Sequence, residues 1–142
     1  MRTSLSSCLA WLVKHRIESI TRRDHDWVFA FDGQVRLVVY CLWRLIENDR
    51  IRFTREDDGQ LFGLPAPVDA AAETTSRLVG TSIVEVEIRE GTLDLRLRFD
   101  SGRVLEIVPE SSGYEAWELC EPGAQYVAVG GGELAVFGGD GR

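Results

Sequence analysis

The chain of 142 residues repeats its own pattern of landmarks, and this internal repeat constrains the fold more than any other feature. Residues 12–64 align with residues 78–137, at a separation of about 66 residues at the start and about 73 at the end. Small insertions at turns would account for that drift. Such self-similarity is typical of a repeated structural unit. The matched landmarks include Phe31 with Phe99, Trp43 with Trp117, and Leu45 with Leu119.

The repeat predicts one pseudo-symmetric domain rather than two domains. Halves of roughly 65 residues would each be marginally stable alone, whereas a hydrophobic content of 44% is enough for one shared core. We therefore expect a single domain over residues 1–142, built from repeats at about 3–66 and 69–138. The expected fold class is α+β, mostly antiparallel β, with a short helix and about six short strands in each repeat.

Each repeat begins with a helix signal. Leu5, Leu9 and Leu12 recur at helical spacing in the first repeat. In the second repeat Asp69 is a predicted N-cap for a helix over residues 70–79. The two helices are therefore expected at equivalent places.

The sharpest structural prediction is the register of three strands between residues 83 and 108. Residues 93–99 alternate strictly between apolar and polar side chains. A two-residue turn at Glu90-Gly91 and a three-residue turn at residues 100–102 would give one apolar face and one charged row. The predicted apolar face comprises Val84, Val86, Leu95, Leu97, Leu105 and Ile107, and the predicted row comprises Glu85, Arg96 and Glu106.

Strand 27–31 is apolar on both faces, because Val28 and Ala30 alternate with three aromatic side chains. A strand of this kind is expected to be covered on both sides. A helix, the other repeat or a second subunit could supply the second cover, so a homo-oligomer is one of the expected arrangements.

The net charge of −7 bears on the partners that the chain can have. It is uneven: residues 1–66 carry +1 and residues 67–142 carry −8. An acidic surface repels phosphate backbones, so nucleic acid is not expected as a partner. The same charge suits a basic protein partner, although it also serves solubility. No stretch approaches the ~20 apolar residues of a membrane span, so no membrane partner is expected.

The three cysteines, Cys8, Cys41 and Cys120, are odd in number and lack metal-ligand spacing. This pattern favours a reducing, cytoplasmic location. The histidines His15 and His25 lie near no nucleophile motif, and the acidic turn around His25 is more typical of a solvated turn than of a metal loop. We therefore expect no catalytic residues, no bound metal and no cofactor.

The most distinctive segment is residues 111–117, which fill the largest insertion between the aligned repeats. Insertions that decorate a duplicated scaffold often carry function, and tyrosine and tryptophan offer large contact areas with a polar group. The alternative is structural: the tryptophans belong to the core, and the tyrosine and glutamate only shape the loop. The candidate binding residues are Trp43, Arg44, Tyr114, Glu115 and Trp117.

Four blocks carry a resemblance to a known family. They are Trp-Arg-Leu at 43–45, the Gly-Gln-Leu-Phe-Gly-Leu-Pro-Ala-Pro-Val-Asp connector at 59–69, Ser-Ser-Gly-Tyr-Glu-Ala-Trp at 111–117, and Gly-Gly-Glu-Leu at 131–134. Through these blocks the chain resembles a family of small bacterial proteins of unknown function. The resemblance implies the duplicated β-rich fold and implies no activity.

Two classes of function remain open. The first is a non-catalytic interaction module, for example an acidic, immunity-type antidote that blocks a basic toxin or enzyme. Small size, negative charge and the lack of a catalytic motif favour it. The second is a small-ligand binder or cryptic enzyme with a pocket between the repeats, near Trp43, Arg44, Tyr114 and Glu115. A buried arginine and glutamate converging on one cavity would favour the second class.

Overall fold

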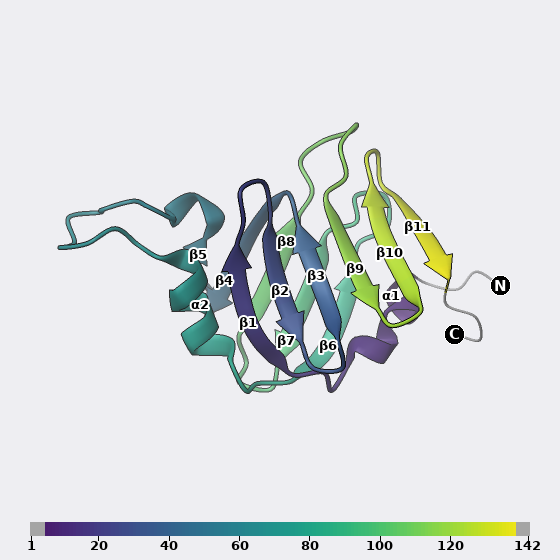
Figure 1. Ribbon diagram of the computed structural model, residues 1–142, viewed down its shortest axis with the longest axis horizontal. Coiled ribbons are helices and arrows are strands. Elements are labelled where there is room, and N and C mark those ends of the chain that lie inside the picture. The colour runs from purple at the N-terminus through teal and green to yellow at the C-terminus, as the bar shows by residue number, and fades with distance from the viewer. Residues whose placement is uncertain (1–4, 139–142) are drawn as a thin grey trace.

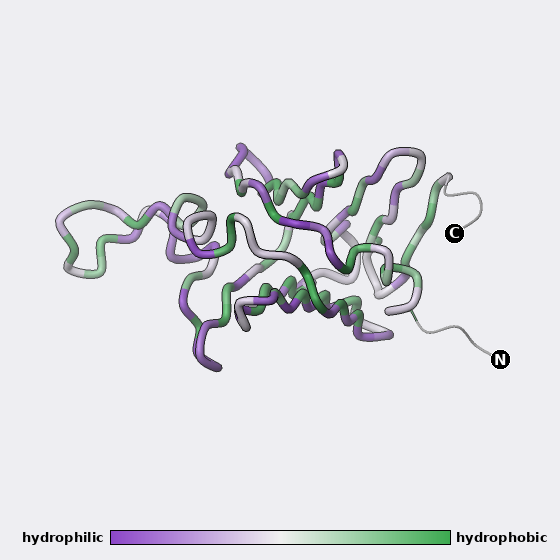
Figure 2. The backbone as a smooth tube through the Cα atoms, turned by 90° about the horizontal axis from the view of Figure 1, so that it is seen from below, coloured by the Kyte–Doolittle hydropathy of each residue, from purple (hydrophilic) through white to green (hydrophobic). Residues whose placement is uncertain are grey.

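The computed structural model describes residues 5–138, which form two stacked antiparallel sheets with a helix at each end (Figures 1 and 2). The buried side chains of both halves form one apolar cluster between the sheets. The elements, in chain order, are α1 Leu5–Cys8, the 3-10 helix η1 Ala10–Leu12, β1 Ile17–Arg22, β2 Trp27–Phe31, β3 Val35–Val39, β4 Leu42–Glu47, β5 Arg50–Thr54, the 3-10 helix η2 Arg55–Asp57, α2 Ala70–Leu78, β6 Ile83–Ile88, β7 Leu95–Phe99, β8 Val104–Val108, β9 Trp117–Glu121, β10 Ala124–Val129 and β11 Glu133–Gly138.

The two halves of the chain exchange strands. The six-stranded sheet has the order β1-β2-β3-β9-β10-β11, and the five-stranded sheet has the order β5-β4-β8-β7-β6. The first half therefore places β4 and β5 beside β8 of the second half, and the second half places β9 to β11 beside β3 of the first. Neither sheet is made by one half alone.

This strand order is the one that a duplication predicts for the first five strands of each half. Read from one edge, β1-β2-β3-β9-β10 corresponds element by element to β6-β7-β8-β4-β5. The β1–β2 ladder shifts register between Ile17 and Ser19, and the β6–β7 ladder shifts between Ile83 and Glu85. The repeat itself stays a prediction, whose direct test is the superposition of residues 12–64 on residues 78–137. The second half adds β11, so the halves contain five and six strands.

The helices lie at opposite ends of the sandwich (Figure 1). The Asp69 carboxylate accepts a hydrogen bond from the Ala72 amide, which confirms the predicted N-cap of α2. The Thr75 hydroxyl accepts the Ile20 amide and so fastens α2 to the edge strand β1. The predicted first helix is interrupted: α1 covers four residues and η1 three. Within residues 5–138 no helix has the length and apolar character needed to cross a bilayer.

The predicted register of β6, β7 and β8 is partly confirmed. Leu97 pairs with Leu105 as predicted. The prediction of a two-residue turn at Glu90-Gly91 is wrong, because β6 ends at Ile88, which pairs with Leu95. The connection between β6 and β7 therefore spans residues 89–94, and β6 is shifted by two residues along β7 relative to the prediction. Because side chains alternate with a period of two, this shift keeps the same side chains on the buried face.

Val84 is a second correction. It was expected in the core, but it is 40% exposed. The register shift between Ile83 and Glu85 interrupts the alternation of inward and outward side chains along β6, so the Val84 side chain faces solvent. The other five predicted inward residues, Val86, Leu95, Leu97, Leu105 and Ile107, are buried.

The predicted charged row exists with a changed membership. Arg96 lies opposite Glu106 on one side, as expected, and opposite Glu87 rather than Glu85 on the other. Its guanidinium is 3.5 Å from Glu87, 3.7 Å from Glu106 and 3.9 Å from Glu85. The row is a half-exposed charge ladder on the outer face of the five-stranded sheet.

Candidate functional site

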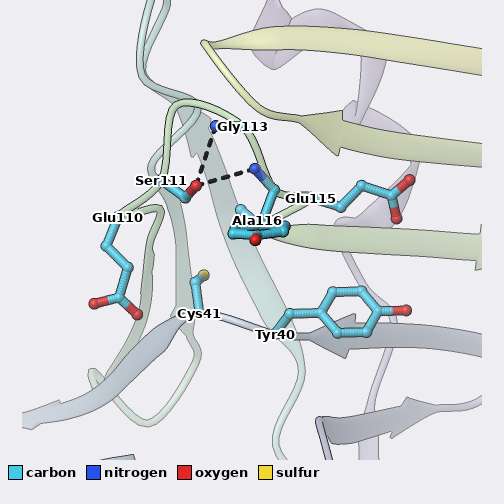
Figure 3. Close-up of a pocket in the computed structure, with 8 residues that line it drawn as sticks. Tyr40, Cys41, Glu110, Ser111, Gly113, Glu115 and Ala116 are labelled. Carbon is cyan, nitrogen blue, oxygen red and sulfur yellow. Dashed lines mark hydrogen bonds between the residues drawn. The ribbon is translucent and has the colours of Figure 1, made fainter.

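A hollow forms where the chain crosses from one sheet to the other. Residues 40–41 connect β3 to β4, and residues 109–116 connect β8 to β9 in the opposite direction. The two crossovers lie against each other and line an open hollow of about 710 Å³, which we call the junction hollow. Its lining residues are Tyr40, Cys41, Glu110, Ser111, Gly113, Tyr114, Glu115 and Ala116 (Figure 3).

Backbone and ionic contacts hold the two crossovers together. The Tyr40 amide donates to the Ala116 carbonyl at 2.9 Å. The Glu110 carboxylate accepts from the Leu42 amide and from the Arg55 guanidinium, both at 3.1 Å. Arg55 also donates to the Tyr40 carbonyl at 3.1 Å. The far end of one crossover is therefore bound to the start of the other, and the shape of the hollow is set by several independent contacts.

The insertion at residues 111–117 is held in one conformation at its tip. The Ser111 hydroxyl accepts hydrogen bonds from the Gly113 and Tyr114 amides, at 3.1 and 3.0 Å (Figure 3). Gly113 packs closely on Gly130, where an added Cβ would lie 2.5 Å from the Gly113 carbonyl carbon. Tyr114 is nevertheless 82% exposed. The loop thus presents a tyrosine ring to solvent from a fixed backbone.

The charge around Tyr40 is predominantly negative. Burial, together with the negative charges of Glu118, Asp26 and Glu115, raises the pKa of the Tyr40 hydroxyl to about 12. Tyr40 and Glu115 extend in the same direction from the crossovers, whereas Glu110 points the opposite way (Figure 3). Asp26 is already paired with Arg23, so the carboxylates of Glu115 and Glu118 give this side of the junction hollow its negative charge.

Cys41 lines the hollow, and its thiol is not activated as a nucleophile. Its side chain is buried. Burial, together with the negative charge of Glu110, raises the pKa of the thiol to about 12. Because the thiolate is the nucleophilic form, the protonated Cys41 packs as a small apolar group. The Cys120 pKa is also raised by burial.

The two predicted tryptophans are core residues. Trp43 and Trp117 have no exposed surface, and the Trp43 ring contacts Trp27 and Phe29 edge-on. The Trp117 indole donates to the Leu93 carbonyl at 3.0 Å. The structure therefore places both side chains in the core, and neither lines the hollow.

Arg44 does not converge with Tyr114 and Glu115. It lies on the outer face of the five-stranded sheet, where its guanidinium donates to Glu106 at 2.6 Å. It lines a separate hollow of about 410 Å³ beside the charge ladder. Of the five predicted binding residues, the structure brings only Tyr114 and Glu115 together at one surface.

Sequence reasoning missed three residues of the hollow: Tyr40, Cys41 and Glu110. Each lies next to a strand end, where one sheet gives way to the other. The signal was present in the alignment of the repeats, because each crossover comes within two residues of an aligned tryptophan. The sequence did not predict that the two halves exchange strands, and this exchange is what brings the two crossovers together.

Residues 5–138 contain no cluster of three or more histidine, cysteine, aspartate or glutamate side chains that could hold a metal ion. In the turn around His25, both carboxylate oxygens of Asp26 instead accept from Arg23, at 2.5 and 2.7 Å. At the other end of β2, the Asp32 carboxylate accepts a hydrogen bond from His15 Nδ1 at 2.9 Å.

No curated protein and no solved structure matches this chain. A family model does match, over residues 8–138. The match includes the two crossovers and the insertion. The chain therefore belongs to DUF6188, a family of unknown function.

Proposed function

We propose that this protein is a non-catalytic binding module whose junction hollow holds a cationic segment of a partner protein. In one form of this proposal the protein is an acidic, immunity-type antidote that covers a basic site on a toxin or enzyme. The net charge of −7 supports a basic partner, since opposite charges accelerate the encounter.

One observation carries the proposal: a tyrosine ring is 82% exposed on a loop that is otherwise held in place. The Ser111 hydrogen bonds and the Gly130 contact fix the backbone before any partner arrives. A preorganised aromatic side chain loses little conformational freedom on binding. Tyrosines in such positions are typical interface anchors. Glu115 beside Tyr114 supplies the charge that a lysine or arginine would recognise.

A small-ligand binder or cryptic enzyme is the second candidate. The volume of about 710 Å³ supports it, because small-molecule pockets span ~300–1,000 Å³. Against an enzyme, the one cysteine in the lining has a thiol pKa of about 12. We also propose a cytoplasmic location, which the free state of Cys8, Cys41 and Cys120 supports.

The test replaces Tyr114 and Glu115 together with alanine and measures capture of proteins from a lysate of the native host. The double variant should lose the partner that the wild type retains, while its melting temperature stays unchanged because both side chains are exposed. Capture by the wild type should weaken as salt is raised.

The matched control is the double alanine variant of Phe137 and Glu133, an exposed aromatic and an exposed carboxylate on β11. It should capture the partner as the wild type does. Equal capture by the Tyr114/Glu115 variant would refute the proposal, and unfolding of that variant would make the segment structural. A metabolite that raises the melting temperature of the wild type but not of the variant would favour the second candidate.

A further inference from the structure

A ten-residue arm projects from the sandwich between η2 and α2. It comprises residues 59–68 and extends away from both sheets (Figures 1 and 2). Its root is closed by two backbone hydrogen bonds of 2.8 Å, from Gly59 to the Val68 carbonyl and from Val68 to the Gln60 carbonyl. Pro65 and Pro67 stiffen the returning strand of the arm. The arm is therefore an ordered projection.

The tip of the arm is a tight turn in an unfavourable conformation. The Leu64 amide donates to the Leu61 carbonyl at 2.7 Å. Both central residues are left-handed, with φ of 47° at Phe62 and 77° at Gly63. This is the pattern of a type I′ turn, whose first central position favours asparagine, aspartate or glycine. A phenylalanine there is strained, because its Cβ crowds the backbone.

The same tip exposes three large apolar side chains. Leu61 is 54% exposed, Phe62 68% and Leu64 53%. They fall within four consecutive residues and lie away from the core, so folding alone gains little from them. A strained and exposed phenylalanine is doubly unfavourable in the free protein. Burial in a partner would recover the apolar contribution.

The charge around the arm selects among possible partners. Residues 59–68 have no charged side chain. Of the five carboxylates in residues 56–76, Glu56, Asp58 and Glu73 form ion pairs with Arg55, Arg22 and Arg77, so the negative charge near the root comes from the other two. These two carboxylates, Asp57 and Asp69, accept hydrogen bonds from the Thr54 and Ala72 backbone amides near the root. An acidic root is repelled by anionic lipid surfaces. It is also repelled by a second copy of a chain with a net charge of −7.

We infer that residues 59–68 form a docking arm, whose apolar tip inserts into an apolar groove with a lysine- or arginine-rich rim on another protein. Phe62 is the anchor, Leu61 and Leu64 flank it, and Asp57 and Asp69 meet the basic rim. This inference concerns a surface separate from the junction hollow and does not require the hollow to bind anything.

The first test is Phe62→Asn, with Phe137→Asn as the matched control. Asparagine tolerates the left-handed conformation at position 62, so this variant should fold and melt at or above the wild-type temperature. Phe137 is 57% exposed on β11, distant from the arm in the chain. Affinity for the partner should fall roughly tenfold or more with Phe62→Asn, as for an interface anchor, and stay unchanged with Phe137→Asn.

The second test identifies what the tip contacts. A photo-crosslinking benzoyl-phenylalanine placed at position 62 is irradiated in a lysate of the native host, and the adduct is mapped by mass spectrometry. The expected result is one protein, crosslinked through an apolar segment flanked by lysine or arginine, in a yield that falls with salt. Flotation with neutral and with anionic lipid vesicles runs in parallel.

Three results would overturn the inference. An adduct between two copies of this chain would make the arm an oligomerisation element. Flotation with vesicles that is lost in Phe62→Asn would make it a membrane anchor. The lack of any adduct, with a melting temperature lowered by Phe62→Asn, would make the arm a structural loop. None of these results bears on Tyr114 and Glu115, so the two proposals fail separately.

Discussion

Trp43 on β4 and Trp117 on β9 are matched in the alignment of the repeats, but only one of the two indole N–H groups donates a hydrogen bond. Trp43 pairs with Ile107 of β8, and Trp117 pairs with Val39 of β3. The Trp117 Nε1 donates to the Leu93 carbonyl, whereas the Trp43 Nε1 is buried and makes no hydrogen bond to any residue in the described range 5–138. The same substitution at the two positions should therefore have different costs.

The expected magnitudes follow from that contrast. Replacing tryptophan with phenylalanine leaves about 40 Å³, which costs about 1 kcal/mol at ~24 cal/mol per Å³. Trp117→Phe also leaves the Leu93 carbonyl buried without its donor, which adds ~1–3 kcal/mol. Trp43→Phe removes a buried donor that has no acceptor, and this gain of ~1 kcal/mol or more offsets the cavity. We expect a loss of ~2–4 kcal/mol for Trp117→Phe and about zero for Trp43→Phe.

Urea unfolding followed by far-ultraviolet circular dichroism measures both values, since it does not depend on tryptophan emission. The midpoints should separate while the slopes agree, because the surface exposed on unfolding is unchanged. Equal destabilisation of the two variants would refute the reasoning, and so would greater destabilisation by Trp43→Phe. A wild-type reference in the same buffer completes the comparison.

Two further predictions concern the charge ladder and Tyr40. Arg96→Ala should cost no more than ~1 kcal/mol because the side chain is half-exposed, whereas Leu97→Ala in the core should cost ~2–5 kcal/mol, both by urea unfolding. The Tyr40 pKa of about 12 exceeds the ordinary tyrosine value of 10.0, so its contribution to stability should be present below pH 10 and be lost as the pH rises toward 12. The ultraviolet absorbance of tyrosinate, measured as the difference between the wild type and Tyr40→Phe, reports this pKa. Glu118→Gln should lower the Tyr40 pKa, because it removes a negative charge that raises it. An unchanged pKa in Glu118→Gln would contradict the assigned cause.

The sequence predicted local features that depend on few residues. The Asp69 cap and the buried alternation at Leu95 and Leu97 follow from local backbone rules and from a period of two. The turn after β6 could not be predicted, because Leu93 is buried with a φ of 64° and receives the Trp117 indole from another sheet. A contact made across the core therefore decided the length of a turn.

The candidate site was only partly predictable for a related reason. Alternation tells which side of a strand faces the core, but it does not tell which strand lies beside it. The exposed loop with Tyr114 and Glu115 was found because it is an insertion. Tyr40 and Glu110 join it only because the halves exchange strands. The projection of the arm was also hidden, since an uncharged connector with two prolines could equally have packed on the sandwich.

The strand exchange has a consequence for how the molecule assembles. The central pair β3–β9 joins residues about 80 positions apart, so each sheet must wait for strands from the distant half, and folding is expected to be slow and cooperative. The first half on its own would leave β3 as an unpaired edge and β4 and β5 without a neighbouring strand. The second half would likewise leave β8 as an unpaired edge and β9 to β11 without a neighbouring strand. Two such pieces could complete each other only as an intertwined pair. The segment at residues 59–68 is then the covalent link that turns a bimolecular assembly into an intramolecular one, at an effective concentration set by its length.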